Sequence, residues 1–365
     1  MFKTTTCIDF PCLDTYLPDI LDALEAHQLP VRRGALNQLI VGAEGEIALT
    51  VRPERLDITI QCQDRLMLNR LRYAVTSLID FNAREVEPRI VWQGDTIGST
   101  IPPDLQPLTV VATEYVTPRM RRIWFTGDDL ARYDTLHQLH CRLLFRRGRG
   151  KPEVWPLMTD TGRIRWPEGA EKLDTRIYTV RSVDIGVGRL AVDFYLDDHG
   201  GPATNWARGA EPGDVVGFIG PAAQGPVIAQ FQVFAGDETG LPGIARCLEA
   251  LGANTRGVAL IEVNGVEDEV PITAPPGVEI RWLYRRGAQP GTSRVLVEEF
   301  ERICWPDNLE RCSFWCGCEY RAFRELRQKA RDLGLRSGQM VVFAHWRAGM
   351  SEPDIAAAGS RAIRD

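Results

Sequence analysis

The chain has 365 residues, 44% of them hydrophobic and 25% charged, with a formal net charge of -6 and a sequence pI near 5.6. This length exceeds what one hydrophobic core usually organises, so two or three domains are expected. The mild acidity argues against a nucleic-acid-binding or anionic-membrane-binding surface spread over the molecule. No stretch has the length of an apolar membrane span, and the start does not resemble a secretory signal, so we expect a cytoplasmic protein.

Residues 1–95 predict a small α+β domain. Leucine and isoleucine recur at helical spacing over residues 13–24, and the alternating stretches IALTV and LDITIQC are joined by the turn-like RPER. LMLNRLRYAVTSLIDF predicts a second amphipathic helix, and RIVW is interpreted as a closing strand. GDTIGSTIPPDLQP, residues 94–107, predicts a linker to the next domain because glycine and proline interrupt any regular pattern.

Beyond the linker, the pattern of predicted elements changes once. Over residues 108–228, short alternating segments such as LTVVATEYV, RIRWP and DVVGFIGP are separated by Gly, Pro and Asp, which predicts an antiparallel barrel. Over residues 229–350, apolar strands alternate with amphipathic helices, beginning with FQVFAG and LPGIARCLEALG, which predicts a parallel sheet with helices on its faces. Residues 351–365 are expected to form a loosely held tail.

One barrel segment, RIYTVR, carries a candidate ligand-binding face. We expect Arg176, Tyr178 and Arg181 to share one face of the strand and Thr179 to lie on the other. Two guanidinium groups near an aromatic ring can hold a diphosphate and stack a flat ring. On this segment alone, an ordinary solvated strand face is an open alternative.

Two further segments have the composition of anion-binding turns. In HGGPAT, two glycines precede Pro202 at a predicted first helical position, and such a helix start offers free backbone N–H groups to phosphate. GDETGLP, residues 236–242, lies between the first strand of the parallel sheet and its helix, where open α/β sheets bind nucleotides. Neither GxGxxG nor a P-loop sequence is present, so the usual dehydrogenase and P-loop interpretations have no support.

Taken in order, RIYTVR, HGGPATNWA, AGDETGLPGIARCLE, WLYRR, WCGCE and HWRAG resemble the siderophore-interacting protein family, whose members are FAD-containing, NAD(P)H-dependent ferric-siderophore reductases of the ferredoxin-reductase superfamily. The resemblance covers residues 108–350 and implies a multidomain protein with an antiparallel FAD-binding β-barrel at 108–228 and a C-terminal α/β parallel-sheet NAD(P)-binding domain at 229–350. Residues 1–95 are similar to a small uncharacterised domain sometimes fused to this family, which brings no known activity.

The resemblance also implies which residues hold the two nucleotides. Arg176 would meet the FAD pyrophosphate, Tyr178 the flavin or ribityl region, and Thr179 the edge of the isoalloxazine. The segment from His199 to Thr204 would lie along the FAD phosphates and adenosine, and the segment from Asp237 to Thr239 would line the nicotinamide pocket. The full predicted set is Arg176, Tyr178, Thr179, Val180, Arg181, His199, Gly200, Gly201, Pro202, Ala203, Thr204, Asp237, Glu238, Thr239, His345 and Trp346.

The sequence departs from the family at two places. Gly240 and Gly243 stand where the family usually has alanines, which predicts a looser loop around the nicotinamide. In AHW, His345 stands where a tyrosine usually precedes the tryptophan, so we expect an imidazole to face the flavin. Donor or substrate preference is expected to change for that reason.

Thiols and histidines invite a metal-site interpretation that we do not favour. The nine cysteines are odd in number and scattered, which fits reduced thiols. Cys312 and Cys316, if both lie in one strand, are too far apart to bind one ion, so packing and corner roles are preferred for them and for Cys318. The HxxHC at residues 137–141 leads directly into a barrel strand, and RRGRGK is interpreted as a hairpin loop rather than a nucleic-acid-binding tract.

The functional prediction is an FAD-containing oxidoreductase that uses NAD(P)H to reduce a ferric siderophore or another ferric chelate and releases ferrous iron, with no acid or base required from a side chain in the main step. Two alternatives stay open: an NAD(P)H:flavin oxidoreductase with a quinone, free flavin or protein acceptor, and a chelate-binding protein with a regulatory flavin module. Arg285 and Arg286 are candidates for contact with an NADPH 2′-phosphate, with the chelate or with solvent, so the donor stays open. We expect no metal cofactor, nucleic-acid partner or membrane partner, and predict no oligomeric state.

Overall fold

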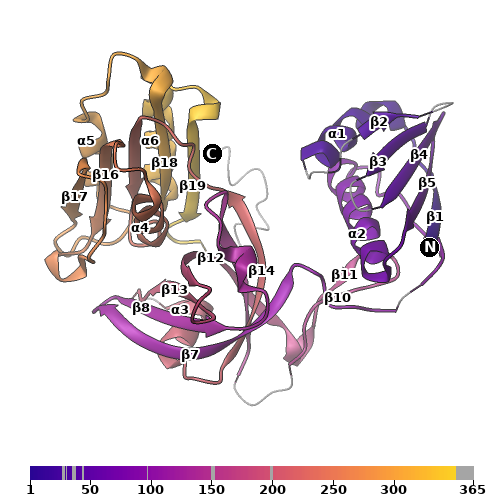
Figure 1. Cartoon of the computed structure of the whole chain (residues 1–365), viewed down its shortest axis with the longest axis horizontal. Coiled ribbons are helices and arrows are strands. Elements are labelled where there is room, and N and C mark those ends of the chain that lie inside the picture. The colour runs from indigo at the N-terminus through magenta and orange to yellow at the C-terminus, as the bar shows by residue number, and fades with distance from the viewer. Residues whose placement is uncertain are drawn as a thin grey trace. The chain divides into compact units, whose positions relative to one another are not determined.

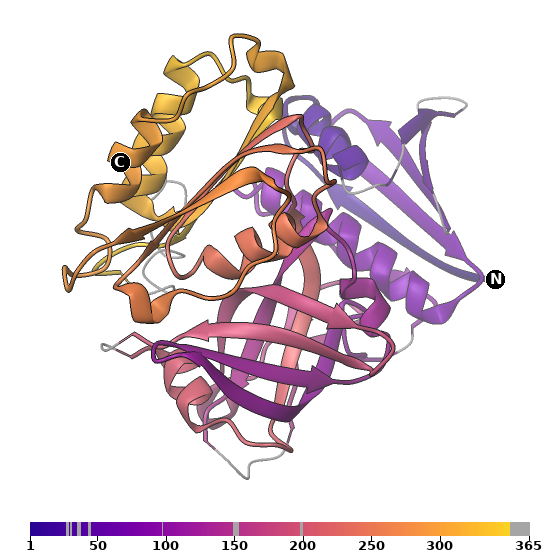
Figure 2. The same cartoon turned by 60° about the vertical axis from the view of Figure 1, so that its left-hand side comes forward.

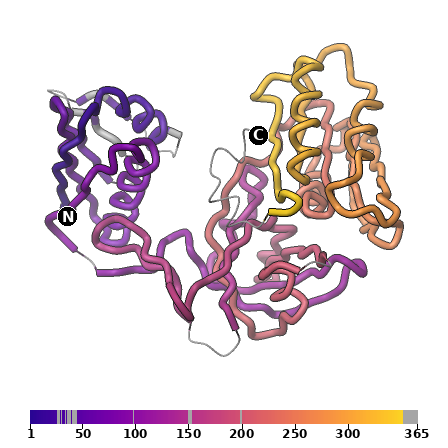
Figure 3. Tube along the Cα trace, turned by 180° about the vertical axis from the view of Figure 1, so that it is seen from behind, coloured from indigo at the N-terminus to yellow at the C-terminus, as the bar shows by residue number. Residues whose placement is uncertain are grey.

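The computed structural model describes residues 1–26, 29, 31–34, 38–42, 45–96, 98–148, 153–197 and 200–350. The chain divides into two compact units, which we call the N-terminal unit (Met1–Leu105 with Arg147–Lys172) and the C-terminal unit (Gln106–Arg146 with Leu173–Asp365). The predicted tail at 351–365, residues 149–151 of the RRGRGK loop and the candidate His199 lie outside the described residues. The passage of the chain between the units can be followed in Figures 1 and 3.

The N-terminal unit is a six-stranded antiparallel sheet with two helices packed against its apolar face. The strands lie in the order β2-β3-β4-β5-β1-β6, and residues from both helices share one hydrophobic core with the inward side chains of the sheet. The side chain of Asp64 accepts a hydrogen bond from the Met67 amide at 2.8 Å, which fixes the start of the second helix. The elements are β1 (Phe2–Asp9), α1 (Leu13–Ala26), β2 (Val31–Arg33), β3 (Gln38–Gly42), β4 (Glu46–Arg52), β5 (Arg55–Cys62), α2 (Arg65–Asn82) and β6 (Gln93–Gly94).

Residues 147–172 join this unit although they follow three barrel strands in the sequence. They form the small hairpin of β10 (Leu157–Met158) and β11 (Ile164–Arg165), and Met158 pairs with Thr100. Arg163 binds the Asp80 carboxylate of α2 through two hydrogen bonds of 3.0 Å. RIRWP therefore lies outside the barrel, and the prediction that placed it there is wrong. The prediction of a strand at RIVW is also wrong, since its Ile90 is buried in the core without strand pairing.

The first part of the C-terminal unit is a closed antiparallel barrel with strand order β12-β13-β8-β7-β14-β9. Figure 2 shows this barrel in magenta and pink. Its interior is filled by apolar side chains from all six strands, and a short helix contributes Ala203 and Ala207 to the same core. The elements are β7 (Leu105–Thr117), β8 (Met120–Thr126), β9 (Gln138–Arg146), β12 (Leu173–Asp184), β13 (Arg189–Tyr195), α3 (Pro202–Gly209) and β14 (Val215–Gln224).

The second part of this unit is a parallel sheet of five strands in the order β17-β16-β15-β18-β19. Helix α4 covers one face, whereas α5 and α6 cover the other (Figure 1). Consecutive residues of each central strand face opposite sides. The predicted barrel and parallel sheet are both confirmed. The elements are β15 (Phe231–Gly236), α4 (Leu241–Ala250), β16 (Arg256–Val263), β17 (Gly277–Tyr284), α5 (Val295–Glu301), β18 (Cys312–Glu319), α6 (Tyr320–Asp332) and β19 (Met340–Trp346).

No helix in the described ranges combines the length and the hydropathy that crossing a membrane requires.

Candidate functional site

Strand β12 carries RIYTVR and divides its side chains between two environments. Tyr178 packs on Phe194 with ring centroids 4.4 Å apart, and Val180 lies in the barrel core. Thr179 and Arg181 are buried on the other side, where Arg181 binds Glu249 of α4 at 2.8 and 2.5 Å. The predicted shared face of Arg181 with Tyr178 is therefore wrong, because residues three apart in a strand point to opposite sides.

Arg176 lies at the half-buried start of this segment. Its guanidinium donates to the carbonyl of Thr175 at 2.7 Å. Because β12 contacts helix α3, the RIYTVR strand and the HGGPAT turn are brought together, as the resemblance implies.

The turn before α3 has the features of a phosphate cradle. Gly200 has a φ of 63°, a left-handed conformation that favours glycine, and its amide donates to Asp197 at 2.6 Å. Gly201 is the N-cap residue, no side chain caps the helix, and a Cβ added at Gly201 would meet open space. Pro202 is the first helical residue. The N–H of Gly200 is thus held by the Asp197 carboxylate, the start of α3 has no side-chain cap, and Ala203 and Thr204 of its first turn are buried.

Helix α4 fastens the parallel sheet to the barrel. Arg246 is buried, and its guanidinium donates to three barrel carbonyls, those of Val180 at 2.8 Å, Tyr133 at 2.7 Å and Thr135 at 2.9 Å. Together with the ion pair between Arg181 and Glu249, these bonds hold the RIYTVR strand against the helix that follows the GDETG loop. The sequence patterns used above contain no signal for this clamp, since an arginine on a helix is ordinarily solvated.

The GDETG loop is tighter than the sequence predicts. A Cβ added at Gly240 would collide with the carbonyl oxygen of Gly317, and one added at Gly243 would lie 2.9 Å from the Trp315 ring. Gly236 also approaches the same carbonyl, at 2.8 Å from its added Cβ. The expectation of a looser loop is therefore wrong, because the two glycines allow β15, α4 and β18 to approach closely.

The three predicted nicotinamide residues have different surroundings. Asp237 accepts hydrogen bonds from the amide of Glu319 at 3.0 Å and from the indole of Trp346 at 2.8 Å. Thr239 contacts Asp237 and His345. Glu238 points elsewhere and binds the guanidinium of Arg285, so the structure brings Asp237 and Thr239 together but separates Glu238 from them.

Arg285 occupies an internal ion-pair cluster at the end of the sheet. It is 6% exposed, binds Glu238 at 2.9 and 2.5 Å, and lies 3.4 Å from Glu262. Burial, with the neighbouring Asp237, raises the pKa of Glu262 to about 7 despite this arginine. The solvent role considered for Arg285 is therefore wrong, whereas Arg286 is exposed, and contact with a 2′-phosphate or with the chelate stays a prediction.

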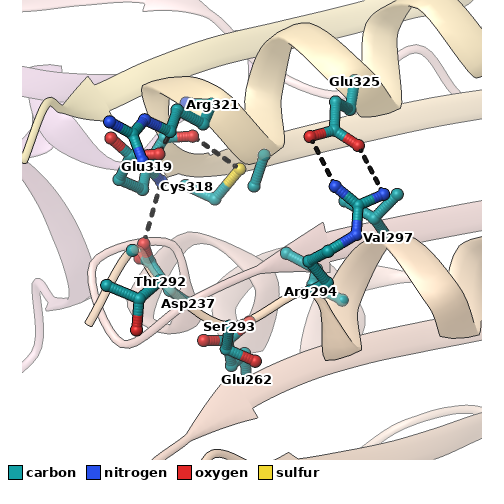
Figure 4. A pocket seen from close by; sticks show the side chains of 13 residues that line it. Asp237, Glu262, Thr292, Ser293, Arg294, Val297, Cys318, Glu319, Arg321 and Glu325 are labelled. Carbon is teal, nitrogen blue, oxygen red and sulfur yellow. Dashed lines mark hydrogen bonds and ion pairs between the residues drawn. The ribbon is translucent and has the colours of Figure 1, made fainter. Parts of the chain in front are cut away.

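A pocket of about 260 Å³ opens beside this cluster, between the ends of β15, β16 and β18 and the starts of α5 and α6 (Figure 4). Asp237, Glu262 and Glu319 line one side, and Arg294, held by Glu325 at 2.9 and 3.0 Å, lines the other. The ends of parallel strands are where open α/β sheets bind nucleotides. The rest of the lining is Gly291, Thr292, Ser293, Leu296, Val297, Cys318, Arg321 and Ala322.

Two imidazoles meet where the barrel touches the sheet. His345 of β19 and His140 of β9 have ring centroids 5.3 Å apart, and His140 is paired in register with Thr179. Burial lowers the pKa of His140 to about 3, with smaller contributions from His345 and Arg246. His345 was predicted as a site residue, but its partner His140 was considered only as part of the HxxHC pattern.

The thiols lie in the strand as predicted. Cys312, Cys316 and Cys318 all belong to β18, with the sulfurs of Cys316 and Cys318 3.5 Å apart on the face covered by α5 and α6. In the HxxHC segment, Cys141 faces the barrel core and His140 the opposite side. Among the described residues, no group of three or more His, Cys, Asp or Glu side chains is arranged to hold a metal ion.

A closed antiparallel barrel, joined through α4 to a parallel sheet with a pocket at its strand ends, is the architecture expected of a two-domain flavoprotein core. Residues 109–225 match the siderophore-interacting FAD-binding domain, and residues 229–349 match the siderophore-interacting protein model. The chain belongs to the siderophore-interacting protein family, which confirms the resemblance and FAD as its cofactor. Both matches lie beyond residue 108, so they do not include the N-terminal sheet.

Individual relatives agree with this assignment. The chain is 28% identical to the ferric vibriobactin reductase of Vibrio cholerae over 251 residues, covering 67% of this chain and 90% of the relative. It is 31% identical to the NADPH-dependent ferric-chelate reductase of Escherichia coli, and the match covers 48% of this chain and 70% of that relative. A solved siderophore utilization protein from T. fusca superposes with a TM-score of 0.60 at 33% identity, covering 70% of this chain and 96% of that structure.

Proposed function

We propose that this protein is an NAD(P)H-dependent, FAD-containing reductase of ferric siderophores or similar ferric chelates. The observation that carries the proposal is the joining of the RIYTVR strand to the nucleotide sheet through Arg181, Arg246 and α4. This connection keeps a flavin strand and a nucleotide-binding sheet in one compact unit. The activities named for the Vibrio cholerae and Escherichia coli relatives support the choice of a ferric acceptor.

The residues present fit a flavin dinucleotide. The uncapped start of α3, with left-handed Gly200 and unobstructed Gly201, suits its phosphates. Arg176 is proposed to bind the pyrophosphate, Tyr178 the flavin or ribityl region, and Thr179 the ring edge. The remaining residues proposed to lie around FAD are His199, Pro202, Ala203, Thr204, His345 and Trp346. Val180, in the barrel core, and Arg181, bound to Glu249, are not proposed as contacts.

When bound, FAD supplies the conversion between a two-electron donor and a one-electron acceptor that the reaction requires. The chain binds the donor in the pocket at the strand ends, where Asp237 forms one wall. Iron leaves because ferrous ion is held less tightly than ferric ion by hard oxygen ligands. Glu238 is not proposed as a contact of the nicotinamide, since Arg285 holds it.

The first experiment is a visible absorption spectrum of the purified protein before and after anaerobic NADH or NADPH. A flavin band that bleaches supports the reductase core, and the more effective donor identifies the nucleotide. A colourless protein that gains no flavin band with added FAD would contradict the proposal.

The acceptor is tested separately. Ferric siderophores, ferric citrate, a quinone, free flavin and a protein electron carrier are compared as oxidants of the reduced protein. Rates that depend on the chelate and exceed those of the other acceptors support the ferric-chelate assignment. Re-oxidation rates that are the same with every chelate would instead favour a general flavin oxidoreductase.

A further inference from the structure

Glu262 brings a buried carboxylate to the pocket at the strand ends. It is the penultimate residue of β16 and points to the face that α5 and α6 cover, because the alternate residues Val258 and Leu260 do so. Its side chain is 5% exposed, and Oε1 lies 3.4 Å from the guanidinium of Arg285. Oε2 has no hydrogen-bond partner among the described residues, although the side chain lines the pocket. A buried carboxylate oxygen without a donor is unfavourable, so this oxygen suits a ligand that donates a hydrogen bond.

The other two carboxylates of this wall are already satisfied. Asp237 accepts four hydrogen bonds, two of them from Thr239. Glu319 accepts two from backbone amides, at 2.5 and 3.1 Å. Hydrogen bonds donated to a carboxylate favour its ionised form, so this wall is negatively charged. Glu262 is therefore the carboxylate of the wall that has an oxygen left for a ligand.

The arginines near this wall are engaged or lie at a distance from β16. Arg285 forms two hydrogen bonds to another carboxylate, at 2.9 and 2.5 Å. Arg294 is held by both oxygens of Glu325, at 2.9 and 3.0 Å (Figure 4). Arg321 is exposed at the start of α6, which follows β18, and β18 lies two strands from β16, or roughly 10 Å away. A phosphate beside Glu262 would therefore meet no uncommitted arginine among the described residues of the pocket.

The place of Glu262 in the sheet fits one half of a dinucleotide. The strand order puts β16 three strands from β19, which carries His345 against the barrel, a distance of roughly 14 Å. A dinucleotide that crosses the strand ends with its nicotinamide directed to the barrel therefore extends its adenosine towards β16. In dinucleotide-binding sheets, an acidic residue near the end of the second strand binds the ribose hydroxyls, and β16 is the second strand of this sheet in the sequence.

This ribose is where the two nicotinamide donors differ. In NADH it carries two neighbouring hydroxyl groups, each able to donate a hydrogen bond to a carboxylate oxygen. In NADPH the 2′-hydroxyl is replaced by a phosphate, whose oxygens accept hydrogen bonds and carry negative charge near pH 7. Beside Glu262, the phosphate would remove a donor and add repulsion between like charges.

We propose that Glu262 accepts a hydrogen bond from the adenosine ribose of the donor and that the protein consequently uses NADH in preference to NADPH. This inference rests on the proposed function and names its donor. Glu262 determines specificity, since it contacts the half of the donor that takes no part in hydride transfer.

The first test measures binding without electron transfer. Titration calorimetry with ADP-ribose and 2′-phospho-ADP-ribose is made at pH 8, because burial raises the pKa of Glu262 to about 7 and the carboxylate is then mostly ionised. Wild type is expected to bind ADP-ribose about 10- to 100-fold more tightly. Glu262→Gln keeps the size of the side chain but removes its charge, and it is expected to reduce this preference about 10-fold. Binding of neither probe, or equal or tighter binding of the phosphorylated probe by wild type, overturns the inference.

The second test follows anaerobic flavin reduction in the FAD-loaded protein by stopped-flow absorption. NADH is expected to reduce wild type at least about 10-fold more efficiently than NADPH, and Glu262→Gln is expected to lower this ratio about 10-fold. Glu310→Gln is the matched control and is expected to leave the ratio unchanged, because Glu310 is exposed and precedes β18, at the opposite end of the strands.

The outcomes separate the two proposals. A protein that binds no FAD, or whose flavin neither donor reduces, overturns the proposed function. A flavin that NADPH reduces as well as NADH does, or a ratio that Glu262→Gln leaves unchanged, overturns this inference alone.

Discussion

Neutral His140 makes the C-terminal unit sensitive to acid. The unfolded chain takes up a proton on this residue below about pH 6.5, whereas the folded protein does so only near pH 3, because burial disfavours the charged ring. The stabilisation is therefore present above pH 6.5 and is lost as the pH falls towards 3. Each pH unit within this window changes the free energy of unfolding by about 1.4 kcal/mol. Between pH 7 and pH 5, the contribution of His140 to that free energy therefore falls by about 2 kcal/mol.

The prediction concerns the difference between wild type and two variants. His140→Gln and His140→Phe both remove the titrating ring, but one is polar and the other apolar. Each is expected to lose about 2 kcal/mol less free energy of unfolding than wild type between pH 7 and pH 5. Urea unfolding followed by tryptophan fluorescence at both pH values measures it. His345, the imidazole facing this ring, and the nearby Arg246 are present in all three proteins, so their direct contributions are shared.

The comparison also separates titration from packing. If only one variant changes the pH dependence, then packing rather than proton uptake is responsible. If wild type and both variants lose the same free energy within about 0.5 kcal/mol, the reasoning from burial is refuted.

Three other predictions follow from the same unit. Arg176→Ala is expected to weaken FAD binding about 10- to 100-fold in a fluorescence titration, whereas Arg165→Ala, an exposed change in the other unit, leaves it unaltered. Arg246→Met leaves three barrel carbonyls without their donor and is expected to lower the free energy of unfolding by roughly 3 kcal/mol, and an unchanged urea midpoint would contradict the clamp. Gly240→Ala is expected to cost about 1–3 kcal/mol by overpacking, while Gly252→Ala, which meets open space, leaves thermal unfolding nearly unchanged.

Local patterns predicted the elements well where local forces determine them. The helices α1 and α2, the hairpin of β4 and β5, and the alternation of strands and helices after residue 229 all follow from periodicity and turn residues. The order of the motifs, rather than any single one, identified the family. Strand β1 was not predicted because two of its inward positions, Thr4 and Thr6, are polar residues, which leaves no hydrophobic alternation in that part of the sequence.

The remaining features depend on contacts that are distant in sequence. Arg246 reaches carbonyls 66 to 113 positions away, and His140 meets His345 from another fold element, so no window of sequence contains either relation. Arg181 lies on the face opposite Tyr178 because the two are three positions apart in the strand, and its partner Glu249 is 68 residues away. The partner of Arg285, Glu238, lies 47 residues earlier, so the segment WLYRR alone does not predict the burial of this arginine.

The insertion at residues 147–172 has a consequence for biosynthesis. Asp80 emerges from the ribosome 83 residues before its partner Arg163, which at typical rates of ~5–20 residues per second corresponds to roughly 4 to 17 s. During that interval β7, β8 and β9 are already made, so the barrel begins before the first unit is complete. A gene divided at the apparent linker would therefore leave the first fragment without residues 147–172 of its own unit, whereas the second fragment would hold the whole C-terminal unit together with that foreign segment.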